Sequence, residues 1–190
     1  MTLAISMEVN ISPISEAHIC GLNESVGIVA RERKFLAVED AYPIDETRKF
    51  VLNNISNGHP QFVALRNEAV VGWCDIIPGN PSSLQAHQGV LGIGLLPEFR
   101  HRGIGARLLE TTLKAAFDRG LTRIQLTAWE SNINAIALYR KFGFIVEGLL
   151  RGAICLDGRY SNLLSMALLS EAHERSDSLQ APSANVFSEK

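Results

Sequence analysis

The chain has 190 residues, of which 46 % are apolar, and carries a formal net charge of −2. This length suffices for one domain with a substantial core, and the charge argues against a nucleic-acid partner. No apolar run approaches the ~20 residues of a membrane span, so we expect no membrane insertion. The N-terminal residues lack the pattern of a secretory signal. The three cysteines and five histidines are dispersed, which predicts no metal site and fits a reducing, cytoplasmic setting.

The first half of the chain alternates between strand and helix patterns. Residues 8–12 predict a short strand, and residues 15–33 predict a helix with apolar side chains at helical spacing. A second helix is expected after Tyr42-Pro43, with Asp45 as its N-cap and Gly58 near its end. Two strands at residues 61–65 and 69–77 then flank an Asn67-Glu68 turn, which is typical of a hairpin.

The second half continues the alternation. We predict strands at residues 87–96 and 123–129, joined by an amphipathic helix at 103–119, and this connection favours parallel pairing of the two strands. A further helix is expected at residues 134–142. Strands at residues 144–150 and 161–169 should close the fold around an Asp157-Gly158 turn. These patterns describe a mixed α/β domain over residues 1–170, followed by a polar, frayed tail over 171–190.

A glycine turn joins the strand at residues 87–96 to the following helix. It reads Arg100-His101-Arg102-Gly103-Ile104-Gly105. Glycine lets backbone N–H groups approach a ligand closely, and a helix N-terminus presents unpaired donors and a positive dipole end. Such a turn predicts a site for phosphate oxygens. A dinucleotide-binding loop requires a third glycine where this chain has Leu108, and the Gly-Lys-Ser/Thr of a P-loop does not occur.

Two motifs in this half resemble the GCN5-related N-acetyltransferases. Residues 100–106 match the R-x-x-G-x-G/A signature of that family, and residues 132–144 match its N-x-x-A-x-x-L-Y-x-x-x-G-F pattern. The resemblance covers roughly residues 61–169. It implies a mixed, mostly antiparallel sheet of about seven strands flanked by about four helices, with one parallel pair that splays apart. It also implies pairing of two copies through the C-terminal strands.

The resemblance implies acetyl-CoA as the acetyl donor. Its diphosphate would lie against the glycine turn and its pantetheine arm in the splayed gap. A backbone N–H near Gly94 or Leu95 would then act as an oxyanion donor. Close packing over Gly89, Gly92 and Gly94 is the alternative explanation for these glycines. The residues expected to contact the cofactor are Gly94, Leu95, Leu96, Arg100, Arg102, Gly103, Ile104, Gly105, Ala106, Asn132, Ala135 and Tyr139; for Asn132, helix capping is the alternative role.

Tyr139 is the candidate general acid, because the matching family tyrosine protonates the leaving thiolate in many members; a core tyrosine is the alternative. The general base stays open. The family often uses an acid on the strand at residues 87–96, but this chain has none between Ala86 and Leu96. His87 is the first choice because of its intrinsic pKa, with Asp75 and Glu130 as alternatives. The residues expected to line the acceptor pocket are Glu32, Trp73, Asp75 and Trp129.

The sequence therefore predicts an N-acetyltransferase that moves an acetyl group from acetyl-CoA to a primary amine by direct attack. Such a reaction needs positioning and charge stabilisation but no covalent acyl-enzyme. A non-catalytic CoA-binding sensor or interaction module is the alternative. The chemical identity of the amine acceptor does not follow from the sequence.

Overall fold

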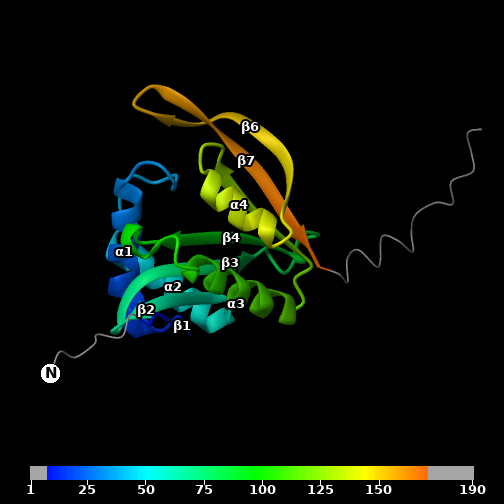
Figure 1. Ribbon diagram of the computed structural model, residues 1–190. Helices are drawn as coiled ribbons and strands as arrows, with labels where there is room; N and C mark the ends of the chain where they lie inside the picture. Colours follow the sequence, from blue (N-terminus) through cyan, green and yellow to red (C-terminus); the bar gives the residue numbers. More distant parts are fainter. Residues whose placement is uncertain (1–7, 171–190) are drawn as a thin grey trace, which may run out of the picture.

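A single seven-stranded sheet organises the protein (Figure 1). The computed structural model describes residues 8–170, so the predicted tail at 171–190 lies outside the described residues. The strand order is β1-β2-β3-β4-β5-β7-β6, with one parallel neighbour pair, β4 and β5. The strands are β1 (Asn10–Pro13), β2 (Gln61–Arg66), β3 (Ala69–Pro78), β4 (Gln88–Leu95), β5 (Arg123–Trp129), β6 (Ile145–Leu156) and β7 (Arg159–Leu169).

Four α-helices flank the sheet, as the sequence predicts. They are α1 (Ile19–Arg31), α2 (Ile44–Asn57), α3 (Ile104–Asp118) and α4 (Ile133–Lys141). The helix α1 packs on α2 and β3, whereas α3 packs on β2, β3 and β4. Successive side chains of a strand point to opposite faces, so Trp73 of β3 borders α1 and α2 while Cys74 lies beneath α3. The mixed α/β architecture is therefore confirmed.

The two parallel strands separate soon after they pair. The β4–β5 ladder is confined to Gln88–Val90 opposite Arg123–Gln125. Beyond it, β5 pairs only with β7, from Arg123 to Trp129. The residues of β4 from Leu91 to Leu95 therefore have β3 on one side and a gap on the other. We call this gap the β4–β5 opening; the predicted splay is confirmed.

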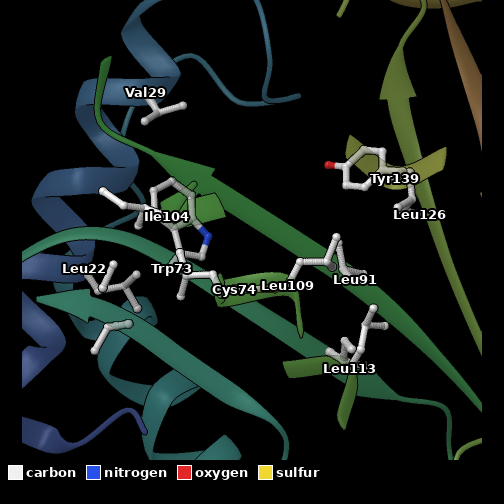
Figure 2. Packing of buried hydrophobic residues seen from close by; sticks show 14 of the residues in the cluster. Leu22, Val29, Trp73, Cys74, Leu91, Ile104, Leu109, Leu113, Leu126 and Tyr139 are labelled. Atoms are coloured by element: carbon white, nitrogen blue, oxygen red, sulfur yellow. The ribbon is translucent and has the colours of Figure 1, made fainter. Parts of the chain in front are cut away.

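The hydrophobic core lies between the sheet and its helices. Leu108, Leu109 and Leu113 of α3, predicted from their helical spacing, belong to the buried cluster. Figure 2 shows Leu109 and Leu113 in this cluster. The β4 residue Leu91 and the β5 residue Leu126 belong to the same cluster. Burial on both sides of the opening fixes the positions of the strands that border it.

The C-terminal hairpin is longer than the sequence predicts. β6 runs to Leu156 rather than residue 150, and β7 begins at Arg159 rather than residue 161. A register irregularity between Leu150 and Ile154, with Gly152 at φ +61°, interrupts the alternation on which the prediction relied. The predicted turn at Asp157 is confirmed, and the hairpin extends away from the rest of the sheet (Figure 1).

A smaller difference concerns the start of the second helix. Pro43, not Asp45, occupies the N-cap of α2, and Asp45 lies in the first turn. The three cysteines are free thiols. Among residues 8–170, no helix is both long and apolar enough to cross a membrane.

Candidate active site

The glycine turn forms an open cradle of backbone donors at the start of α3. The first helical hydrogen bond of α3 runs from Arg107 N to Gly103 O (3.1 Å), so the N–H groups of residues 104–106 have no acceptor within the helix. Gly103 has φ +77°, and a Cβ built on it meets nothing within 4 Å. A Cβ on Gly105 meets only a methyl of Leu138, at 3.6 Å. The left-handed backbone of Gly103 favours glycine by itself. At Gly105 protein packing leaves room for a Cβ, and the missing side chain lets an anion approach the donors closely.

The edge of β4 that is not paired with β5 leads from the opening to this cradle. Leu96 N donates to Val71 O of β3 (2.9 Å). Because the backbone groups of consecutive residues point to alternate sides, those of Leu95 and Ile93 point into the β4–β5 opening. Of the two donors that the sequence suggests, Leu95 N–H therefore faces the opening, and Gly94 N–H faces β3.

The glycines of β4 make room for side chains of β3. A Cβ on Gly94 would lie 2.2 Å from the Trp73 ring, and one on Gly92 would lie 3.0 Å from a carboxylate oxygen of Asp75. Trp73 and Asp75 pair with Gly94 and Gly92 in the ladder. The packing alternative thus accounts for both glycines, although cross-strand side chains, not a helix, do the packing.

A cavity of about 460 Å³ lies between α1, α2 and β3, and we call it the α1–α2 cavity. Asp75 borders it and is only 7 % exposed. Among the described residues, none forms a hydrogen bond or ion pair with the Asp75 carboxylate. Burial raises the pKa of Asp75 to about 7. A buried carboxylate that titrates near neutral pH and faces a cavity is suited to accept a proton.

Tyr139 of α4 is 7 % exposed and packs against Phe144, with ring centroids 5.8 Å apart. Figure 2 shows its hydroxyl directed away from Leu126 and toward the side of the view that holds Trp73. Burial raises the pKa of Tyr139 above its usual range. The phenol therefore stays protonated at neutral pH and can donate a proton.

The chain thus carries an anion cradle at the start of α3, an unpaired edge on β4, a buried carboxylate at the α1–α2 cavity and a buried phenol on α4. A family model described as "Acetyltransferase (GNAT) family" matches residues 30–144. The chain belongs to this GNAT family. The matched segment includes the cradle, the opening and both titratable groups.

Individual relatives within the family have different acceptors in their names. The chain is 33 % identical over 117 residues to an N-alpha-acetyltransferase of Saccharolobus solfataricus, covering 56 % of this chain and 68 % of the relative. It is 32 % identical over 82 residues to the spermidine N(1)-acetyltransferase of Escherichia coli K12. That match covers 40 % of this chain and only 42 % of the relative.

Solved structures agree with the fold. A ribosomal-protein-alanine N-acetyltransferase from Brucella melitensis matches with a TM-score of 0.79 and 25 % identity, over 85 % of this chain and 99 % of that one. A GNAT phosphinothricin acetyltransferase from Sinorhizobium meliloti, in complex with AcCoA, matches with a TM-score of 0.81 and 22 % identity. The match covers 95 % of this chain and 96 % of that one. At these identities the likeness supports the fold rather than a substrate.

Two of the predicted site residues, Arg100 and Glu32, pair with each other. The sequence predicts Arg100 as a cofactor contact and Glu32 as an acceptor contact. In the structure Arg100 Nη1 donates to Glu32 Oε2 (2.8 Å), Nη2 donates to Oε1, and Nε donates to Leu95 O (2.9 Å). The guanidinium also lies 4.9 Å from the Phe35 ring centre. Both charges are thereby neutralised, and the pair ties the end of α1 to the end of β4.

Three other predicted residues lie at the start of α4, beside a second cavity and just before β4. Asn132 caps α4, since its Oδ1 accepts from Ala135 N (3.3 Å), so its alternative role is present. Trp129 is buried at the end of β5 and borders a second, smaller cavity. His87 is exposed at the start of β4, at the paired end, where its carbonyl accepts from Thr122 N. The structure therefore does not bring His87 to the opening.

Sequence reasoning missed most of the wall of the α1–α2 cavity. Val26 of α1, Val38 of the following loop and Phe50 of α2 line it together with Gln61 of β2. Phe50 is 39 % exposed, which is unusual for a large aromatic residue on the packed side of a helix. Val26 and Phe50 have the helical spacing of core residues, and Val38 and Gln61 belong to no motif, so the sequence carries no separate signal for them.

Proposed function

We propose that this protein transfers an acetyl group from acetyl-CoA to a primary amine by direct attack. The observation that supports this most is the continuity between the open edge of β4 and the donor cradle at the start of α3. A diphosphate and an extended amide-containing arm together require this combination of donors. The residues present therefore fit acetyl-CoA.

In this proposal, acetyl-CoA binds mainly to backbone groups of the protein. The N–H groups of Ile104, Gly105 and Ala106 would hold the diphosphate, with the exposed Arg102 adding charge at the rim. The edge of β4 would hold the arm. When bound, acetyl-CoA supplies the activated acetyl group.

The chain's own groups would then move two protons. Asp75 accepts a proton from the amine nitrogen, taking the role for which the sequence first suggests His87. Leu95 N–H donates to the carbonyl oxygen as its negative charge grows, which is worth about 3 kcal/mol. As the N–C bond forms and the C–S bond breaks, the Tyr139 hydroxyl gives its proton to the departing sulfur.

Replacement of the proposed acid tests this assignment. We expect Tyr139→Phe to lower the rate of amine-dependent thiol release by about 100-fold or more. Acetyl-CoA affinity, measured by titration calorimetry, should stay within about threefold because the hydroxyl is not part of the donor cradle. The matched control is Tyr160→Phe, because Tyr160 is 75 % exposed on the C-terminal hairpin. An unchanged rate in Tyr139→Phe would remove Tyr139 from the acid role.

The same assay separates the enzyme from a non-catalytic module. Acetyl-CoA binding with no thiol release on any primary amine would favour the sensor or interaction module. We also propose that the protein forms a homodimer through the edge of β6, the last strand of the sheet.

A further inference from the structure

The α1–α2 cavity differs from a general amine site in its lining. Its volume of about 460 Å³ is within the range of small-molecule pockets. Most of its walls are aliphatic or aromatic side chains from α1, α2, the loop between them and β3. They are Leu22, Val26, Leu36, Ala37, Val38, Tyr42, Phe50 and Trp73.

The charges of this cavity are of one sign. Asp75 lies at its buried side and Glu46 at its exposed side. Among the described residues that line it, there is no lysine, arginine or histidine. The arginines at the end of α1 and in the adjoining loop are neutralised elsewhere. Arg31 pairs with Asp40, and Arg33 pairs with both Glu39 and Asp157.

This lining excludes one group of acceptors. A carboxylate or phosphinate on the acceptor would enter an apolar cavity without a counter-charge and next to Asp75. Burial of an unpaired charge costs several kcal/mol. Free amino acids are therefore poor candidates.

A second cation on the acceptor is also disfavoured. Asp75 is the one buried carboxylate of the cavity, and the amine to be acetylated occupies it. A second ammonium group would have to cross apolar walls to reach Glu46 at the exposed side. Diamines and polyamines would therefore bind less well than a monoamine of the same length.

Resting on the proposed function, we propose that the acceptor is a primary monoamine on an apolar, aromatic or branched aliphatic body without a carboxylate. Its nitrogen lies at Asp75, and its body fills the α1–α2 cavity. Trp73, which covers Gly94 beside the opening, forms the wall between the acceptor body and the edge of β4.

Acceptors that share one body test the proposal. The probes are 2-phenylethylamine, phenylalaninamide and phenylalanine, together with pentylamine and 1,5-diaminopentane. With kcat/KM calculated on the neutral-amine concentration, we expect 2-phenylethylamine to exceed phenylalanine by at least about 100-fold, because the buried carboxylate meets no cation among the described lining residues. Pentylamine should exceed 1,5-diaminopentane by about tenfold.

A cation placed in the wall should change this preference. Val38→Arg adds a guanidinium to the loop side of the cavity, and we expect the advantage of 2-phenylethylamine over phenylalanine to shrink by at least tenfold. The matched control is Val90→Arg, because Val90 is 52 % exposed on β4 and does not line the cavity. The wild-type ranking tests the proposal even if Val38→Arg fails to fold.

Different results would contradict the acceptor proposal and the proposed acetyltransferase function. Calorimetric titration of the same amines into the protein–CoA complex measures how tightly each amine binds, in the absence of turnover. Selective binding of 2-phenylethylamine with no thiol release would overturn the proposed function alone. A higher kcat/KM or affinity for phenylalanine than for 2-phenylethylamine, or for 1,5-diaminopentane than for pentylamine, would overturn the acceptor proposal.

Discussion

The buried carboxylate of Asp75 lowers the stability of the fold, and the same raised pKa suits it to accept a proton. In an unfolded chain an aspartate has a pKa of about 3.9, and burial in the fold raises the pKa of Asp75 to about 7. The folded state therefore binds this proton more tightly, so stability falls as the pH rises from about 4 to about 7. The penalty above pH 7 is on the order of 4 kcal/mol.

Asp75→Asn should separate the two effects. We expect its free energy of unfolding, measured in urea, to exceed that of the wild type by a few kcal/mol at pH 8 and to match it near pH 4. Its acetyl transfer should fall by at least about 100-fold, and the rise of wild-type kcat/KM through pH 7 should disappear. Asp118→Asn, at an exposed residue of α3, serves as the control with neither effect. Equal stability of Asp75→Asn and the wild type at pH 8 would contradict the raised pKa.

Gly94 illustrates how a single missing Cβ shapes the site. Gly94→Ala places a carbon 2.2 Å from the Trp73 ring, so one of the two must move. We expect a loss of about 1–3 kcal/mol in the free energy of unfolding, as for other overpacked sites. Gly148→Ala, where a Cβ meets nothing within 4 Å, should change stability by under about 0.5 kcal/mol. Adding Trp73→Leu to Gly94→Ala should recover part of the loss; no recovery would mean that the Trp73 contact is not the cause.

At the scale of elements, the Arg100–Glu32 pair connects α1 to the end of β4. Each side chain is 23 % exposed, so the pair is screened less than a surface pair. It fixes Leu95 through its carbonyl, and Leu95 carries the proposed oxyanion donor.

A double-mutant cycle measures this connection. With Arg100→Met and Glu32→Gln we expect a coupling energy of about 1–3 kcal/mol in urea unfolding. The exposed Lys114–Asp118 pair should couple by under about 0.5 kcal/mol. Coupling of Arg100 and Glu32 no larger than that of the surface pair would show that the connection does not hold the elements together.

At the scale of the whole molecule, the sheet ends in β6, which among the described strands pairs with β7 alone. β6 is the last strand in the order, and four of its apolar side chains are between 41 and 63 % exposed. A long, apolar edge strand is a site for pairing with another chain, and two copies related by a twofold axis would cover both edges at once. The residues are Ile145, Val146, Leu149 and Leu150.

The oligomeric state tests the dimer. We expect the wild type to elute as a dimer in size-exclusion chromatography with light scattering, and Leu149→Lys to shift it to monomer by placing a charge in the interface. The comparison variant Leu84→Lys changes a residue that is 98 % exposed in a loop and should stay dimeric. A wild type that is monomeric at tens of micromolar would refute the proposal.

The amino-acid sequence alone predicted the cradle, the order of the strands and helices and the parallel pair. These follow from local signals, namely glycines at a helix start and apolar side chains at helical or alternating spacing, which neighbouring residues in the chain create together. It also identified Tyr139 and Asp75 as candidates, although it could not rank Asp75 above His87.

Only the tertiary structure decided which candidates meet. His87 immediately precedes β4 and Leu95 ends it, but the parallel ladder closes the first end of β4 and leaves the other open. Arg100 and Glu32 neutralise each other across 68 positions of the sequence. The raised pKa of Asp75 and the apolar walls around it arise from elements distant in the chain, and burial by such elements is a property of packing that no local pattern encodes.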